Sequence, residues 1–165
     1  MKAVLIFICY IISFAPTSTI YLVRHAEKVI SNSNDPQLTQ AGIVRAENLK
    51  DILLSKKITQ IYSTDFKRTI STAKPLSDVI KVPIQIYSND SSGLMLKHII
   101  KSNKNTLIIA HSNTLLPLLD SINLRHNKNT IPDNEYDNLF IITVEKGKAV
   151  HLEEIKYGSL SLPNK

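Results

Sequence analysis

The stretch that decides the fold of this 165-residue chain is Ile20-Tyr21-Leu22-Val23-Arg24-His25-Ala26-Glu27-Lys28. Its first four residues are apolar or aromatic, and such an uncharged run is typical of a buried central strand of a parallel sheet. An arginine, a histidine and two further charged residues follow almost at once. Open α/β sheets form their sites beyond the carboxyl ends of the strands, so this strand end is a candidate site.

Strands and helices alternate along the rest of the chain. Apolar spacing predicts helices near 40–55, from Asp65 to about 80, at 94–100 and at 114–122, with strands near 58–63, 84–87 and 106–110. Two last strands, 139–144 and 150–155, flank Glu145-Lys146-Gly147-Lys148, which has the composition of a hairpin turn. This order predicts a three-layer α/β/α sandwich with a mostly parallel sheet and an antiparallel edge strand.

The helix ends and helix faces can also be read from the residue types. Thr39 and Asp65 are the expected N-caps of the first two helices. Pro75 should kink the second helix, and Pro117 should fall in the first turn of the fourth, where proline is tolerated. The expected apolar faces are Ile43, Ala46, Leu49 and Leu53 in the first helix, and Ile70, Ala73, Leu76, Val79 and Ile80 in the second.

Composition limits the classes of partner. A chain of this length with 43% hydrophobic residues is most simply one soluble domain with a real core. Its formal charge of +6 favours anionic partners or substrates. Lysine and arginine are scattered and form no basic stripe interleaved with aromatic residues, so we do not expect nucleic acid as a partner.

The N-terminus has the pattern of a secretory signal. Met1-Lys2 precedes an apolar run from Ala3 to Ala15, which is too short to span a bilayer comfortably. We therefore expect a signal peptide at 1–18, a domain at 19–165, and a periplasmic or secreted protein without stable membrane insertion once the signal is removed. The alternatives are an uncleaved N-terminal anchor or a first strand of the domain. The only cysteine, Cys9, lies in this run, so the mature protein would have none.

Two histidines and two arginines should meet at one sheet edge. His25 and Arg24 follow the first strand, Arg68 follows the second, and His111 follows the strand that ends at Ala110. Guanidinium groups make rigid forks for phosphoryl oxygens, and a neutral imidazole is a competent nucleophile towards phosphorus. A second imidazole adds charge where the transferred group gathers it. This set suits phosphoryl transfer through a phosphohistidine.

Four blocks follow one another along the chain, namely Leu22-Val23-Arg24-His25, Leu38-Thr39-Gln40-Ala41-Gly42, Ser63-Thr64-Asp65-Phe66-Lys67-Arg68-Thr69 with Thr72-Ala73, and Ala110-His111-Ser112-Asn113. As an ordered set, spanning about Thr19 to Leu152, they resemble the histidine phosphatase superfamily, which includes the cofactor-dependent phosphoglycerate mutases. Most members have glycine after the first histidine, and this chain departs from them with Ala26.

The resemblance implies a role for each matching residue. His25 would become phosphorylated, while Arg24, Arg68 and His111 would hold the phosphoryl group; neither a metal ion nor a cofactor is implied. The family also needs an acid to protonate the leaving oxygen. Asp90, in the segment after the third strand, is the candidate, with an N-cap of the next helix as its structural alternative.

Two other positions bear on the acid. Glu27 is a second candidate, although we expect it rather to orient a basic side chain of its loop. Some relatives have aspartate directly after the second histidine, and Ser112 excludes that arrangement here. The remaining candidates for substrate binding are Glu27, Lys28, Ser112 and Asn113. Asp137 is a candidate for a supporting role at the rim, and the other histidines (His98, His126 and His151) are expected to be structural or superficial.

The sequence thus predicts a metal-independent phosphomonoester hydrolase. Its expected substrate is a phosphorylated small molecule, an envelope sugar phosphate or a phosphoprotein, since short connections leave little room for a large cap over the site. A phosphoglycerate mutase-type phosphotransferase is one alternative. A non-catalytic anion-binding module on the same fold is the other.

Overall fold

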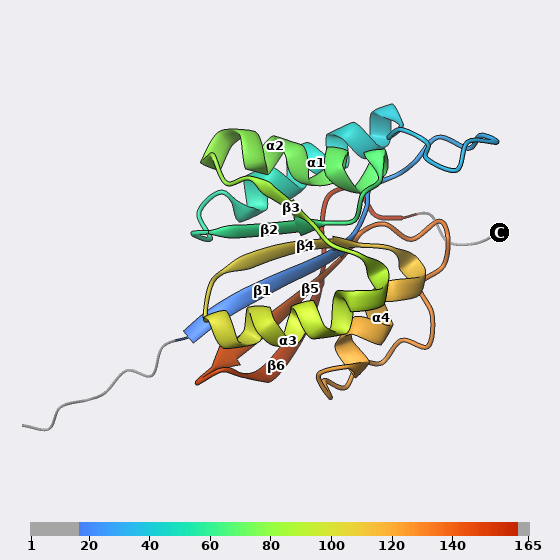
Figure 1. Ribbon diagram of the computed structural model, residues 1–165. Coiled ribbons are helices and arrows are strands. Elements are labelled where there is room, and N and C mark those ends of the chain that lie inside the picture. Colours follow the sequence, from blue (N-terminus) through green and yellow to red (C-terminus); the bar gives the residue numbers. More distant parts are fainter. Residues whose placement is uncertain (1–16, 162–165) are drawn as a thin grey trace, which may run out of the picture.

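A six-stranded sheet forms the centre of the protein, whose computed structural model describes residues 17–161. The strands lie in the order β3-β2-β4-β1-β5-β6, and the first four are parallel (Figure 1). β5 is antiparallel to β1 and lies one position inside the edge that β6 forms. The strands are β1 (Thr17–Arg24), β2 (Gln60–Ser63), β3 (Ile84–Ile86), β4 (Thr106–Ala110), β5 (Asn138–Glu145) and β6 (Lys148–Lys156).

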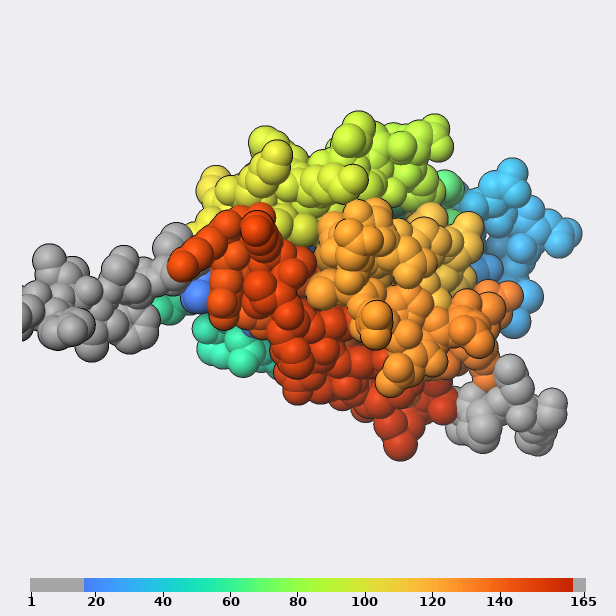
Figure 2. Space-filling view, turned by 90° about the horizontal axis from the view of Figure 1, so that it is seen from below, coloured from blue at the N-terminus to red at the C-terminus, as the bar shows by residue number. Residues whose placement is uncertain are grey.

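Helices cover both faces of this sheet, which confirms the three-layer α/β/α fold. α1 (Gln40–Leu53) and α2 (Lys67–Ile80) lie on one face, while α3 (Ser92–Ser102) and α4 (Ser112–Asp120) lie on the other (Figure 1). A short 3₁₀ helix, η1 (Asn89–Ser91), precedes α3. From the α3 side, the β5–β6 hairpin lies beside the segment that contains α4 (Figure 2).

The central strands supply the two hydrophobic cores alternately. Successive side chains of a strand point to opposite faces. Ile20 and Leu22 of β1 therefore pack with α3 and α4, whereas Tyr21 and Val23 pack with α1 and α2. All four are almost fully buried. This double burial explains why β1 is a continuous apolar run rather than an alternating one.

The carboxyl ends of β1 and β4 form the point where the sheet changes direction. These strands are neighbours, with Arg24 paired to Ala110. β1 leads through α1 to β2, two positions to one side, and β4 leads through α4 to β5, two positions to the other. Such a divergence leaves a crevice between the two strand ends, where α/β proteins bind ligands.

Several local expectations are corrected. In α1 the buried face runs through Gly42, Arg45, Ala46, Leu49 and Leu53, while Ile43 is exposed. In α2 it runs through Thr69, Thr72, Ala73 and Leu76, so Val79 is exposed as well. Pro117 is the sixth residue of α4 rather than a first-turn residue. The helix faces are displaced because polar side chains are buried beside the strand ends.

The helix caps are partly as expected. Thr39 caps α1 by accepting from the Gly42 amide. The N-cap of α2 is Phe66, not Asp65, and makes no side-chain cap. Instead, Asp35 accepts a hydrogen bond from the Lys67 amide at 2.8 Å, across from the 28–38 loop. At the hairpin, Lys146 and Gly147 both have positive φ, as a two-residue type I′ turn requires.

The expected signal peptide lies almost wholly outside the described residues. β1 begins at Thr17, two residues before the expected start of the domain, and Thr17 and Ser18 pair with β5. Between residues 17 and 161, no helix has the length and apolar character needed to cross a membrane.

Gly42 allows α1 to approach the loop that follows His25. A Cβ placed on Gly42 would lie 2.3 Å from the backbone oxygen of Glu27. That same oxygen accepts a hydrogen bond from the Thr39 amide. The start of α1 is therefore packed directly against the backbone of the candidate site.

Replacing Gly42 should consequently destabilise the protein. Gly42→Ala should lower the free energy of unfolding by about 1–3 kcal/mol, because backbone must move to admit the methyl group. Gly93→Ala is the matched control: its Cβ would meet only Ser121 atoms at 3.7 Å, and alanine favours a helix, so stability should be unchanged or raised by up to about 1 kcal/mol. Urea unfolding measures both; equal effects would contradict this packing.

Candidate active site

His25 and His111 meet where β1 and β4 end. The His25 amide donates to the Ala110 carbonyl at 3.0 Å, which continues the pairing of the two strands by one residue. The ring centroids of the two histidines are 5.4 Å apart. Their exposed fractions are only 3% and 7%, so the structure brings both predicted histidines into one buried cluster.

The hydrogen bond at Nδ1 fixes the tautomer of neutral His25. This nitrogen lies 2.8 Å from the Ala26 carbonyl oxygen, which can only accept. Nδ1 therefore carries the proton, and Nε2 carries the lone pair. The Ala26 amide donates to the Thr72 hydroxyl of α2, and Ala26 is not among the described residues with positive φ. An alanine consequently fits here without strain.

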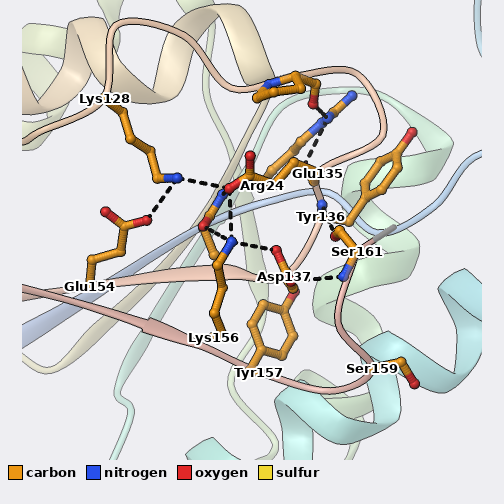
Figure 3. Close-up of polar contacts among 12 residues, drawn as sticks. Arg24, Lys128, Glu135, Tyr136, Asp137, Glu154, Lys156, Tyr157, Ser159 and Ser161 are labelled. Atoms are coloured by element: carbon orange, nitrogen blue, oxygen red, sulfur yellow. Dashed lines mark hydrogen bonds and ion pairs between the residues drawn. The ribbon is translucent and has the colours of Figure 1, made fainter. Parts of the chain in front are cut away.

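Arg24 is held by the loop that precedes β5. Its Nη1 donates to the carbonyls of Pro132 and Glu135 at 2.8 and 3.0 Å, and its guanidinium lies 4.1 Å from the centroid of the Tyr136 ring (Figure 3). Its Nη2 lies 3.5 Å from the Asp133 carboxylate, which is fully exposed. The guanidinium of Arg24 is thus held at its edge by backbone carbonyls and on its face by the Tyr136 ring.

Arg68 is oriented in a similar way on the other side. Its guanidinium carbon lies 4.2 Å from the centroid of the Phe66 ring. Its Nη1 donates to the Asn34 carbonyl at 3.3 Å and lies 3.7 Å from the Asp35 carboxylate. The two aromatic rings that hold the arginines also contact the two histidines. The ring centroids of Tyr136 and His25 are 6.0 Å apart and those of Phe66 and His111 are 5.3 Å apart, so the four rings form a connected row.

Both arginines have a buried donor that is not used within the described residues. Within residues 17–161, the Nε atoms of Arg24 and Arg68 are buried and have no hydrogen-bond partner. A buried donor without a partner is costly, so it indicates a ligand that would supply the acceptor. An anion with several oxygens, such as a phosphoryl group, satisfies that requirement beside the two histidines.

The cluster keeps both histidines neutral. Burial lowers the pKa of His25 to about 3; the hydrogen bond to Ala26 opposes this, and the charges of Arg24, His111 and Arg68 add to it. Burial also lowers the pKa of His111 to about 4, with Arg68 and Arg24 contributing. A neutral His25 with its lone pair on Nε2 is the form of imidazole that acts as a nucleophile.

An ion-pair cluster supports the loop that holds Arg24. The Glu135 carboxylate binds both Lys128 and Lys156 at 2.8 Å, and these charge-assisted contacts oppose the effect of burial and lower its pKa to about 2 (Figure 3). Lys156 also binds Asp137 at 2.8 Å, and Asp137 accepts from the Ser161 amide. Asp137 is therefore a buried residue that helps to hold this loop, and its carboxylate is bound by Lys156 and the Ser161 amide.

Glu27 is held by an arginine of α1. Arg45, only 4% exposed, places Nε and Nη2 within 2.9 Å of the Glu27 carboxylate. Its remaining donors bind the carbonyls of Tyr157 and Ser159 at 2.8 Å. Glu27 thus binds a basic side chain, although this side chain comes from α1 and not, as expected, from the loop of Glu27 itself. The segment 157–161 links Arg45 to the loop of Arg24, and we call it the C-terminal strap.

The other predicted residues lie around the cluster rather than in it. Lys28 lines a pocket of about 510 Å³ with Arg24, Asp133 and Tyr136. Asp90 is exposed in η1 and lines another pocket, with Thr64 and Phe66. The N-cap of α3 is Ser91, so the capping alternative for Asp90 was wrong. A further pocket takes in Ser112 and Asn113, and it shares no lining residue with the pocket of Arg24.

Sequence reasoning missed four residues that shape the cluster, namely Arg45, Thr64, Phe66 and Tyr136. Arg45 carried a signal, since it falls at helical spacing between Gly42 and Leu49. Thr64 and Phe66 lie inside a recognised block but were given no role. Tyr136 lies in a polar, irregular segment, where no periodicity marks a side chain as inward-facing. His98 and His151 are exposed, and His126 pairs with Asp120 at 3.1 Å.

Metal ligands do not gather in the part of the chain that the structure describes. No three histidine, cysteine, aspartate or glutamate side chains there lie in an arrangement that holds an ion. The polar groups of the cluster are mainly cationic or donor groups, which suit an anion instead.

Known proteins share this fold and part of this sequence. Residues 20–89 match the histidine phosphatase superfamily (branch 1). No curated protein sequence matches the chain. Among solved structures, protein histidine phosphatase SixA complexed with tungstate is 15% identical, with a TM-score of 0.67 over 84% of this chain and 96% of that one.

Two further structures show how widely the fold is used. A mycobacterial glucosyl-3-phosphoglycerate phosphatase is 9% identical, with a TM-score of 0.66 over 86% of this chain and 98% of that one. A phosphoglycerate mutase from Bacillus anthracis is 15% identical, with a TM-score of 0.62 over 86% of this chain and 93% of that one. Residues 20–89, which hold the blocks of His25 and Arg68, thus match the histidine phosphatase superfamily, and the likeness in fold extends over most of the chain.

Proposed function

We propose that the protein is a metal-independent phosphomonoester hydrolase that works through a phosphohistidine at His25. The observation that carries the proposal is the pair of buried, unpartnered Nε donors of Arg24 and Arg68, which flank two neutral histidines. These donors need oxygen acceptors, and His25 offers a lone pair between them. A phosphoryl group meets both requirements at once.

The chemistry follows from this arrangement. The lone pair of His25 Nε2 attacks phosphorus, a P–N bond forms, and the P–O bond to the leaving group breaks. The leaving oxygen takes a proton from an acid. Water then attacks the phosphohistidine, the P–N bond breaks, and inorganic phosphate leaves with Nε2 free again. The arginine donors stabilise the charge that gathers on the phosphoryl oxygens in both steps.

The names of proteins with the same fold support a substrate class. We propose a phosphorylated small molecule, an envelope sugar phosphate or a phosphoprotein, because these proteins are named as a protein histidine phosphatase, a glucosyl-3-phosphoglycerate phosphatase and a phosphoglycerate mutase. A mutase-type phosphotransferase is the less favoured form. From the pattern of residues 1–18 we also propose export to the periplasm or the medium, or attachment by an uncleaved anchor.

A non-catalytic anion-binding module is the second candidate. It is favoured by one observation: Asp90, the candidate acid, lines a pocket that shares no lining residue with the pocket of Arg24. Such a module would bind phosphate through the same arginines without turnover. Trapping of a phosphoenzyme decides between the two functions.

Replacing the nucleophile should abolish turnover. His25→Ala should reduce hydrolysis of p-nitrophenyl phosphate in EDTA by about a thousand-fold or more, and the acid-labile phosphoenzyme trapped with the parent protein should disappear. His98→Ala, at an exposed position of α3, is the matched control and should keep full activity. Undiminished activity in His25→Ala would disprove the proposal, and absence of both turnover and phosphoenzyme in the parent would favour the binding module.

The low pKa of His25 should keep the nucleophile active in acid. A histidine with an ordinary pKa would lose about 30-fold of its neutral form between high pH and pH 5, whereas His25, with a pKa of about 3, should lose almost none. Rapid-quench rates of phosphoenzyme formation at pH 5 and pH 7 measure this. Below about pH 6.5 this histidine takes up a proton in the unfolded chain but stays neutral in the folded protein, so the free energy of unfolding decreases as the pH is lowered. Circular dichroism must therefore verify folding at each pH.

The leaving-group acid should be visible in the choice of substrate. Asp90→Asn should lower kcat for an alkyl phosphate by about a hundred-fold, but should barely affect p-nitrophenyl phosphate, whose leaving group needs no proton. Asp133→Asn is the comparison, because Asp133 lines the pocket on the Arg24 side. A selective loss in Asp133→Asn alone would transfer the role to Asp133, and equal losses on both substrates would mean that neither residue is the acid.

A further inference from the structure

His111 is bound to a short chain of threonine hydroxyls. Its Nε2 lies 2.9 Å from the Thr64 hydroxyl oxygen, which lies 3.0 Å from the Thr69 hydroxyl oxygen. The Thr69 hydroxyl in turn lies 2.9 Å from the Thr64 carbonyl and 2.8 Å from the Phe66 carbonyl. Thr64 and Thr69 are at most 2% exposed, so water competes little for these contacts.

Counting hydrogens gives this chain one direction. The two carbonyl oxygens can only accept, so the single hydrogen of the Thr69 hydroxyl goes to them. Thr69 must then accept from Thr64, whose own single hydrogen is used in that bond. Thr64 has only an acceptor left for His111, and Nε2 of His111 must supply the hydrogen. The opposite direction would leave the contacts of Thr69 with both carbonyls without a hydrogen.

The surroundings of His111 keep this N–H on a neutral ring. Arg24 and Arg68 are the charged groups that act on it, from β1 and α2, and both disfavour a second proton. The uncharged rings of His25 and Phe66 contact it from the β1 end and from the turn before α2. The backbone continues directly from His111 into α4, whose N-terminal dipole also disfavours a cation.

We propose that Thr64 is a positioning residue that holds His111 in its Nε2–H tautomer, so that His111 acts as a neutral hydrogen-bond donor to the transferred phosphoryl group. This inference rests on the proposed function. A phosphoryl oxygen is a stronger acceptor than a hydroxyl oxygen, so the Nε2 hydrogen turns from Thr64 to the substrate on binding. The donor is available without first protonating the ring, whose pKa of about 4 makes protonation costly at neutral pH.

The tautomer can be read directly in the free protein. Imidazole ¹⁵N shifts distinguish Nδ1–H from Nε2–H, and a His111→Gln sample assigns the signals. The parent protein and Thr64→Ser, which keeps the hydroxyl, should show Nε2–H. Thr64→Val should shift the signals part of the way towards Nδ1–H, because only the Thr114 amide, which donates to the His111 side chain, then favours Nε2–H. Thr69→Val should also move towards Nδ1–H, because the hydrogen of Thr64 becomes free to donate to Nε2.

Activity gives an independent readout. Thr64→Val should lower kcat about three- to ten-fold with little change in KM, as for the loss of a hydrogen bond made mainly in the transition state, and Thr64→Ser should restore it. The loss should be smaller at pH 4 than at pH 8, because His111, with a pKa of about 4, is protonated in about half of the molecules at pH 4 and then carries a hydrogen on Nε2. A structural defect alone would not give this pH dependence.

The outcomes separate this inference from the proposed function. A Nδ1–H signal in the parent, or unchanged Nε2–H in Thr64→Val, would overturn the role of Thr64 even if a phosphoenzyme forms. Conversely, the tautomer result stands if no phosphoenzyme is found, since it is measured without substrate. If Thr64→Val does not fold, the parent and Thr69→Val spectra still decide the direction of the hydroxyl chain.

Discussion

The pairing of β1 with β4 is the constraint on which the site depends. It places Arg24 opposite Ala110, and the hydrogen bond from the His25 amide to the Ala110 carbonyl extends the match into the loops. His25 and His111, which are 86 positions apart in the chain, thereby become neighbours, and their ring centroids lie 5.4 Å apart. The connections that follow β1 and β4 run to opposite sides of the sheet, which leaves a crevice at the carboxyl ends of these two strands. The histidine and arginine side chains gather at that crevice.

Burial of several basic side chains at one place is electrostatically unfavourable. Two guanidinium groups and two imidazoles share a poorly hydrated volume. Each guanidinium stacks on an aromatic ring, and both imidazoles stay neutral, which reduces this repulsion. The buried Nε donors of Arg24 and Arg68 have no acceptor among residues 17–161, so the hydrogen bonding of the cluster is incomplete there. A site that is unsatisfied when empty gains more from its ligand than one whose donors are already paired.

The fold and the site differ in how far the sequence foretells them. The apolar runs at β1 and β4 and the turn at Lys146-Gly147 mark their elements, because burial on both faces and positive φ restrict the residue types. The meeting of His25, Arg68 and His111 follows from topology. The polar residues that fix their orientation do not, since Arg45 and Thr69 lie on helix faces that an apolar pattern assigns to other residues. Tyr136 depends on the conformation of an irregular segment, which tertiary contacts alone determine.

The C-terminal strap has a consequence for the order in which the protein matures during synthesis. β1 is made first but lies between β4 and β5, so it must wait for both before it has partners. Tyr157, Ser159 and Ser161, which bind Arg45, Asp137 and the backbone of Tyr136, leave the ribosome later still. A growing chain can thus pair its histidines before the loop of Arg24 is anchored. The edge of the sheet that carries Arg24 is therefore completed among the last events of folding.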